Sequence, residues 1–214
     1  MGSSVYSGMM TAEMTLDDAS VVTEVLNGER AAFRTLVERY QDRLYDLAFR
    51  MTGHRQDAED IVQTAFVRMY GKLSTYDPER KFSTWAYAIA LNTARDLLRR
   101  KRVLGFFTLD RSAEDGESPL PEPADASPGP EESLDGKQVL AELRLRLRKL
   151  PETLSAPFIL RHFHHDGLEE IAEKLGVSKN VVNVRLHRAR ERLYSDLLET
   201  FHGLDGKPDE GGLR

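Results

Sequence analysis

The sequence predicts an all-α protein with two helical domains, a three- to four-helix bundle and a C-terminal helix-turn-helix domain, joined by a flexible acidic linker. Two observations predict the helices: apolar residues recur at intervals of three and four in both halves, and Gly176 separates two such segments. A third observation is that charge is segregated: residues 28–102 carry +5, residues 103–136 carry −8 and residues 137–202 carry +3. We therefore expect an acidic N-terminal extension (1–27), a first domain (28–102), a flexible linker (103–136), a second domain (137–202) and a disordered tail (203–214).

The composition excludes several classes of protein. The absence of Cys removes disulfides, Cys-ligated zinc, iron–sulfur clusters and thiol nucleophiles. No apolar run is long enough to span a membrane, and the N-terminus lacks the pattern of a secretory signal. We therefore predict a cytoplasmic protein without membrane insertion.

The first domain is expected to contain three principal helices. The first has an apolar face from Phe33 to Met51 and ends at Gly53. The second opens with the acids of residues 57–60, which suit the positive end of the helix dipole. The third begins near Ser83 or Thr84, either of which suits an N-cap. Its expected buried stripe is Trp85, Ile89, Thr93, Ala94 and Leu97.

This third helix is expected to end in four consecutive cations, residues 99–102. Cations in a last turn favour the negative end of the helix dipole, which explains some of them. Four in a row exceed what capping needs, so the cluster favours an anionic partner.

The second domain carries a helix-turn-helix pattern. A helix is expected from about Ser155 to Phe163, with Pro157 in its first turn. An amphipathic helix over residues 168–175 then turns at Gly176, and Ser178 caps a last helix. The expected core positions of that helix are Val182, Leu186, Ala189 and Leu193.

The opposite face of the last helix is basic and polar, since it carries Lys179, Asn183, Arg185, His187, Arg188, Arg190 and Arg192. Such a helix suits the DNA major groove, because Arg bonds guanine and Asn bonds adenine in bidentate fashion. The alternative to DNA binding is that this is simply the solvent-exposed face of an ordinary helical bundle. The helix-turn-helix spacing favours DNA binding.

No catalytic or metal-binding group emerges. His162, His164 and His165 are nearly adjacent, so their side chains point in different directions, and no fourth ligand is apparent. The paired acids Glu169 and Glu170 more simply serve the dipole of their helix than acid–base chemistry. We expect no enzyme activity, no cofactor, no metal and no small-molecule substrate.

The combination resembles bacterial extracytoplasmic-function RNA polymerase sigma factors over about residues 28–199. In the first domain, residues 57–63 (DAEDIVQ), 82–92 (FSTWAYAIALN) and 94–100 (ARDLLRR) are similar to the family's region 2. In the second domain, residues 150–152 (LPE), 158–161 (FILR), 170–172 (EIA) and 185–190 (RLHRAR) are similar to its region 4. The order and separation of these strings make the resemblance specific.

The resemblance implies three binding surfaces, and with them core RNA polymerase, promoter DNA and an anti-sigma factor as partners. Core polymerase would be bound by Asp57, Asp60, Gln63 and Arg68. The −10 element would be bound by Tyr76, Arg80, Lys81, Phe82, Asn92, Arg95, Arg99, Arg100, Lys101 and Arg102, with the aromatic faces of the loop at 76–82 stacking on an unpaired base. The −35 element would be bound by Ser178, Lys179, Asn180, Asn183, Arg185, His187, Arg188 and Arg190.

One departure from the family's pattern lies near the start of the last helix. Where the family usually has Gly-Thr-Val-Lys-Ser, residues 180–184 read Asn-Val-Val-Asn-Val, and we expect this to change the −35 sequence that is read. The acidic linker carries the charge of RNA, and the resemblance implies that it occupies the channel of nascent RNA. A plain solubilising tether remains the alternative.

Three classes of function are open at this point. A sigma factor would recruit polymerase to promoters, in a stress or envelope response as the resemblance implies. A stand-alone helix-turn-helix regulator would use the first domain for sensing or dimerisation. A small helical enzyme would need a catalytic set that the sequence does not supply. The basic helix end and aromatic loop of the first domain favour a second DNA-contacting domain, and hence the sigma factor.

Overall fold

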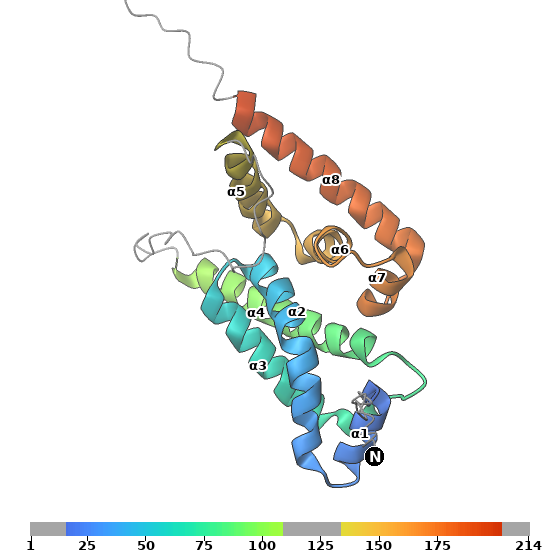
Figure 1. The fold of residues 1–214 in the computed structure, drawn as a ribbon. Helices are drawn as coiled ribbons and strands as arrows, with labels where there is room; N and C mark the ends of the chain where they lie inside the picture. Colours follow the sequence, from blue (N-terminus) through green and yellow to red (C-terminus); the bar gives the residue numbers. More distant parts are fainter. Residues whose placement is uncertain (1–15, 109–133, 203–214) are drawn as a thin grey trace, which may run out of the picture.

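The computed structural model describes residues 16–108 and 134–202, and every regular element in these two ranges is a helix (Figure 1). The all-α prediction is therefore confirmed. Most of the expected linker (109–133), the tail (203–214) and residues 1–15 lie outside the described residues.

Four α-helices form the first domain: α1 (Asp18–Leu26), α2 (Phe33–Thr52), α3 (Arg55–Gly71) and α4 (Phe82–Thr108). Short 3₁₀ turns at Arg30–Ala32 and Leu73–Thr75 connect α1 to α2 and lead out of α3. Gly53 ends α2 as predicted, in the left-handed conformation with φ of 75°. Helix α3 begins two residues earlier than Asp57, with His54 as its N-cap.

Helix α1 was not foreseen within the acidic N-terminal extension. The Asp17 carboxylate caps it by accepting a hydrogen bond from the Ser20 N–H at 2.7 Å. Its three valines are buried, and the carboxylate of Asp18 accepts hydrogen bonds from Arg39 and Tyr40 on α2. Residues 18–26 are therefore a packed part of the first domain.

The prediction for α4 was wrong in its bounds and in its buried face. The helix begins at Phe82, before Ser83 or Thr84, and it runs past Arg102 to Thr108. Thr93 and Ala94 are buried as expected, whereas Trp85, Ile89 and Leu97 are only half-buried. The additional buried residues are Phe82, Ala86, Tyr87, Ala90 and Leu91. The difference arises partly because α4 packs on α7 of the second domain as well as on its own bundle, and partly because Phe82 packs on Tyr40 and Tyr76.

Four further helices form the second domain: α5 (Leu134–Lys149), α6 (Glu152–His162), α7 (Leu168–Leu175) and α8 (Lys179–His202). Helix α6 begins at Glu152 and not at Ser155, because the Pro151 carbonyl already accepts the N–H groups of Leu154 and Ser155 at 2.8 and 3.0 Å. Pro157 consequently lies inside the helix and not in its first turn, where its missing N–H leaves one intrahelical hydrogen bond unmade.

The helix-turn-helix has the predicted form. Gly176 ends α7 in the left-handed conformation, with φ of 64°. The Ser178 hydroxyl accepts a hydrogen bond from the Val181 N–H at 3.4 Å, close to the start of α8. Each of the four predicted core positions of α8 is buried: Val182, Leu186, Ala189 and Leu193.

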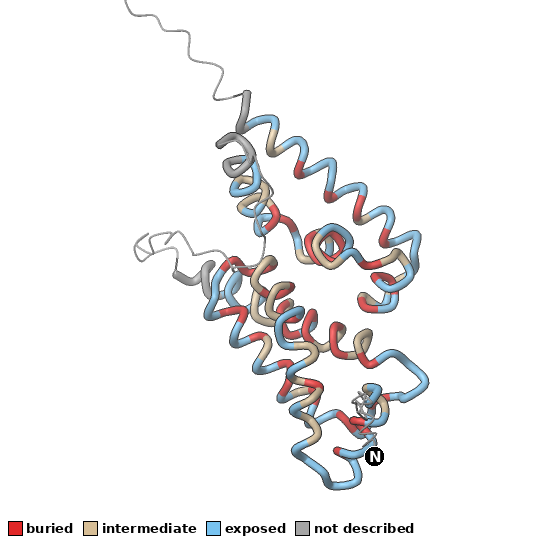
Figure 2. Tube along the Cα trace, in the orientation of Figure 1, coloured by how far each residue is buried: buried red, intermediate tan, exposed pale blue. Residues whose placement is uncertain are grey.

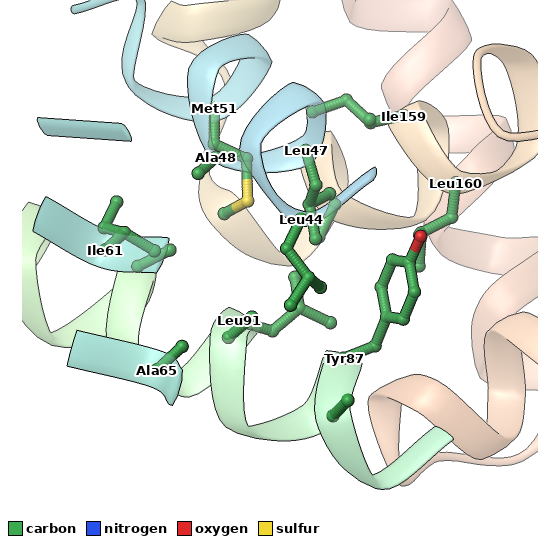
Figure 3. Close-up of a cluster of buried hydrophobic side chains, with 14 of the residues drawn as sticks. Leu44, Leu47, Ala48, Met51, Ile61, Ala65, Tyr87, Leu91, Ile159 and Leu160 are labelled. Atoms are coloured by element: carbon green, nitrogen blue, oxygen red, sulfur yellow. The ribbon is translucent and has the colours of Figure 1, made fainter. Parts of the chain in front are cut away.

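The two domains share one hydrophobic core (Figure 2). Leu44 and Leu47 of α2 lie in the same buried cluster as Ile159 and Leu160 of α6, and Tyr87 of α4 belongs to it (Figure 3). Helices α2 and α4 of the first domain pack on α5, α6 and α7 of the second. The chain is therefore folded back on itself, with its two helical domains in direct contact.

Polar side chains close this interface around His164. The Tyr87 hydroxyl and His164 Nδ1 share a hydrogen bond of 3.0 Å, and His164 Nε2 donates to the Asp46 carboxylate at 3.1 Å. Burial raises the pKa of the Tyr87 hydroxyl well above its ordinary value, so Tyr87 stays a donor at neutral pH. Burial alone would raise the pKa of Asp46, but hydrogen bonds from His164 and Arg50 hold it below its ordinary value.

Two cations add to the contact. The Lys174 ammonium of α7 lies 4.0 Å from the ring centroid of Tyr87 and 2.7 Å from the carboxylate of Asp166. The Arg50 guanidinium of α2 lies 3.9 Å from the centroid of the Phe163 ring. Each cation thus binds an aromatic face across the domain boundary, where desolvation strengthens the attraction.

We predict that Ile159→Ala destabilises both domains together. Ile159 is fully buried in the shared core, so its truncation should cost about 2–5 kcal/mol in the free energy of unfolding. Urea denaturation followed by circular dichroism should show one transition, moved to lower urea, and Thr153→Ala on the exposed side of α6 should barely move it. Two separate transitions in the unsubstituted protein would contradict a shared core.

Candidate nucleic-acid interface

Helices α7 and α8 form the better defined of two basic surfaces. The core residues of α8 face α6 and α7, so the opposite face is left toward solvent. Of the predicted −35 residues, Ser178, Lys179, Asn180, Asn183, His187, Arg188 and Arg190 are exposed, and Arg185 is half-buried. The structure therefore gathers them on the outer side of one helix, as major-groove recognition requires.

Two of these residues have acidic partners in the free chain. Lys179 Nζ lies 2.5 Å from Glu169 Oε1 of α7, and His187 Nε2 lies 3.3 Å from Glu191 Oε1 one turn further along α8. Hydrogen bonding from Lys179 lowers the pKa of Glu169. Both ion pairs are solvent-exposed and therefore weak. A DNA phosphate can thus replace the acidic partner of either residue at little cost in free energy.

The second basic surface runs along the outer side of α4. Asn92 Oδ1 accepts a hydrogen bond from Arg95 at 2.8 Å, and Arg99 lies 3.8 Å from Asp96. Asn92, Arg99 and Arg100 are exposed, and Arg95 is half-buried. These four predicted −10 residues therefore lie on one accessible face.

The other two cations of the cluster at residues 99–102 pair with acids of neighbouring helices. Lys101 Nζ lies 2.6 Å from Asp57 Oδ2 of α3, and Arg102 lies 3.2 Å from Glu152 of α6. Arg102 therefore contributes to the domain interface, together with Lys81, which lies 3.8 Å from Glu170 of α7. Beside Lys81, the Thr84 hydroxyl donates to Glu173 at 3.5 Å.

The aromatic residues of the loop at 76–82 are not open for stacking. Tyr76 and Phe82 are 8% and 2% exposed, and both rings pack on Trp85 with centroids 5.5–5.6 Å apart. The Tyr76 hydroxyl donates to the carbonyl of Arg80 at 2.6 Å, which fixes the course of the loop. The expectation that the faces of Tyr76 and Phe82 stack on a base is therefore wrong for this conformation.

A cleft of about 450 Å³ lies over this loop. It is lined by Tyr76 and Phe82, by the cations Arg80 and Lys81, and by Asp17, the N-cap of α1. Arg80 itself lies 3.4 Å from Asp77. The cleft thus combines buried aromatic support with polar walls, which suits a single extruded base better than a duplex.

The predicted polymerase-binding residues separate into two pairs. Asp60 and Gln63 are exposed on α3, and Gln63 lines a cleft of about 270 Å³ between α2 and α3. Asp57 is buried beside Lys101, and Arg68 bonds Thr93 and Asp96 of α4, each at 3.1 Å. Asp57 and Arg68 therefore hold α3 against α4 in this structure.

Sequence analysis missed part of the α2–α3 surface. Tyr45 and Val62 line the same cleft as Gln63, and Val67 and Tyr70 of α3 are exposed apolar residues nearby on the chain. The available signal was Val67 and Tyr70 themselves, which are apolar but lie off the helix face that carries Ile61, Ala65 and Met69.

No metal-binding group or membrane-spanning helix is present within residues 16–108 and 134–202. No three His, Asp or Glu side chains gather there as ligands. None of the helices in these ranges is both long and apolar enough to cross a bilayer.

We predict that Glu152→Gln with Glu170→Gln strengthens DNA binding by the free chain. Both carboxylates face cations that the sequence assigns to DNA, so removing their charge frees Arg102 and Lys81 for phosphates. Fluorescence anisotropy with labelled single-stranded DNA across a salt series should give a higher affinity. The slope of log K against log salt concentration should become steeper by about 0.7 for each freed cation.

The control is Glu199→Gln, an exposed acid near the end of α8, combined with Glu24→Gln on α1, which makes the same change in net charge. An equal gain in affinity for the control would show that net charge, and not release of these two cations, is responsible.

Comparison with known proteins identifies both domains. Residues 36–103 match the model of sigma-70 region 2, and residues 140–193 match that of sigma-70 region 4. The ECF RNA polymerase sigma factor SigW of Bacillus subtilis (strain 168) is 31% identical over 176 residues, which cover 82% of this chain and 94% of SigW.

Two solved structures agree with the fold. CnrH in complex with the cytosolic domain of CnrY has a TM-score of 0.60 at 26% identity, covering 86% of this chain and 97% of CnrH. The sigma factor RpoE in complex with the anti-sigma factor NepR from Bartonella quintana has a TM-score of 0.56 at 22% identity, covering 77% of this chain and 96% of RpoE, and it shows the fold alone. With region 2 and region 4 in the expected order and a relative matched over nearly its whole length, the chain belongs to the extracytoplasmic-function RNA polymerase sigma factors.

Proposed function

We propose that this sigma factor binds core RNA polymerase through the α2–α3 surface and places its two basic surfaces on the −10 and −35 elements of a promoter. The observation that carries the proposal is the presence of two separate basic helical faces, on α4 and α8, in one chain. A conventional dimeric regulator needs one such face per subunit. Two different faces suit two different elements of one asymmetric site.

The polymerase contact is assigned to Asp60 and Gln63 with the adjoining cleft. The exposed carboxylate and amide offer hydrogen bonds, and Tyr45 and Val62 supply apolar surface in the cleft. Transient protein–protein interfaces combine such an apolar centre with a polar rim. Asp57 and Arg68 act indirectly, by fixing α3 on α4.

Within the first domain, Asn92, Arg95, Arg99 and Arg100 are assigned to the −10 DNA directly, since their side chains share one accessible face. Arg80 and Lys81 are assigned to the phosphates beside the cleft. Tyr76 and Phe82 line the cleft, and Lys101 holds α4 against α3 through its ion pair with Asp57. In the second domain, the outer face of α8 is assigned to the −35 element.

Promoter binding requires the two domains to separate. The elements lie roughly 25 base pairs apart, as their names state, which is ~85 Å of B-form DNA. A compact chain of this length has a diameter of only about 45 Å. The contacts of Lys81 and Arg102 with the second domain must therefore be exchanged for contacts with DNA and polymerase.

We infer the partners and the cellular setting from membership of the family. We infer an anti-sigma factor that holds the chain inactive, because RpoE of Bartonella quintana, which has this fold, forms a complex with the anti-sigma factor NepR. The chain acts where polymerase and promoter DNA meet, in the bacterial cytoplasm, in a stress or envelope response. It supplies binding and strand capture, and the catalysis belongs to the polymerase.

We predict that Asp60→Ala with Gln63→Ala weakens binding to core RNA polymerase about tenfold, since two polar contacts contribute roughly 1.4 kcal/mol together. Fluorescence anisotropy of labelled chain titrated with core enzyme measures the affinity, and run-off transcription measures the consequence. The matched control is Glu29→Ala with Gln56→Ala, both exposed and outside the cleft. Failure of the unsubstituted chain to bind active core enzyme would contradict the proposal itself.

A further inference from the structure

Two apolar side chains interrupt the polar outer face of α8 near its start. Val184 is 49% exposed and Val181 is 38% exposed, although both lie within the first two turns of the helix. Valine is a poor helix former, because its branched side chain loses rotamer freedom against the preceding turn. Valine at an exposed helix position therefore adds no stability to the helix unless its side chain contacts a binding partner.

Val184 lies at the centre of the outer face. With 3.6 residues per turn, its position is opposite the buried stripe formed by Val182, Leu186, Ala189 and Leu193. Its neighbours on the helix surface are the residues three and four positions away. These are Asn180, Val181, His187 and Arg188, of which the polar three are exposed.

We propose that Val184, supported by Val181, reads the 5-methyl group of thymine in the −35 element. The proposal rests on the proposed function, because it requires α8 to enter the major groove at that element. The residues near the start of a recognition helix are those that meet base edges. A valine at this place has no hydrogen bond to offer, so the thymine methyl is the base-edge group that it matches.

The neighbours of Val184 define the surrounding bases. Asn180 can bond the N6 and N7 edge of adenine, and Arg188 can bond the O6 and N7 edge of guanine. Val181 lies three residues before Val184 and extends the apolar strip toward the start of the helix. The −35 element should therefore contain at least one thymine whose methyl group is needed, flanked by purines that Asn180 and Arg188 contact.

The test uses the reconstituted holoenzyme. Selection from duplex DNA with a randomised −35 segment first identifies the preferred sequence. Each thymine in that segment is then replaced by deoxyuridine, which keeps the base pair and removes only the methyl group. At one thymine we expect about fourfold weaker holoenzyme binding, the value of one buried methyl-sized group.

Variants assign the effect to the side chain. Val184→Ala should weaken binding to the thymine promoter by about fourfold and should abolish the difference between thymine and deoxyuridine. Val139→Ala on α5 is the matched control, since Val139 is 39% exposed and lies off the recognition helix. The control should keep the full deoxyuridine effect.

The outcomes separate this inference from the proposed function. If a −35 sequence is selected but deoxyuridine is tolerated at every position, or if Val184→Ala keeps the deoxyuridine effect, the thymine reading is overturned and the sigma-factor assignment stands. If the holoenzyme selects no −35 sequence at all, the assigned role of α8 is overturned, and the thymine reading with it.

Discussion

The packing of α6 and α7 against α2 and α4 determines most of what this structure can do. Ile159 and Leu160 complete a core begun by Leu44 and Leu47, so neither domain buries its apolar surface fully without the other. The polar chain from Tyr87 through His164 to Asp46 then fixes the register of the contact. Because buried polar groups are costly when unpaired, this chain favours one relative placement of the domains.

The same contact involves two cations that we propose to bind DNA. Glu170 and Glu152 of the second domain lie beside Lys81 and Arg102 of the first, so the acids occupy positions that phosphates would take. These ion pairs are mostly exposed and individually weak. The apolar core and the hydrogen bonds of His164 therefore stabilise the closed arrangement more than these ion pairs do, while the ion pairs engage two cations that we propose to bind DNA.

Sequence reasoning succeeded where local patterns decide the structure. The core positions of α8, the glycine ends of α2 and α7, and the Ser178 cap follow from spacing and from backbone freedom alone. The gathering of the predicted −35 residues on one helix face has the same origin. Helix periodicity places them there whatever else the chain does.

Contacts between distant parts of the chain were beyond such reasoning. Tyr87 and His164 are 77 residues apart, and neither residue's neighbourhood indicates the other. The buried face of α4 was misassigned partly for this reason, since Tyr87 on that face contacts His164 of the second domain. Tyr76 and Phe82 were expected to be open, because an aromatic loop has the same composition whether its rings face solvent or each other.

The most direct test of the account is a distance measurement between the two domains. The chain has no Cys, so spin labels can be placed at Gln56→Cys on α3 and Ser195→Cys on α8, both exposed. Double electron–electron resonance on the free protein should give one narrow distance. In the complex with core polymerase and promoter DNA the distance should lengthen by roughly 40 Å. A broad distribution in the free chain, or an unchanged distance on the promoter, would contradict the closed arrangement and its opening.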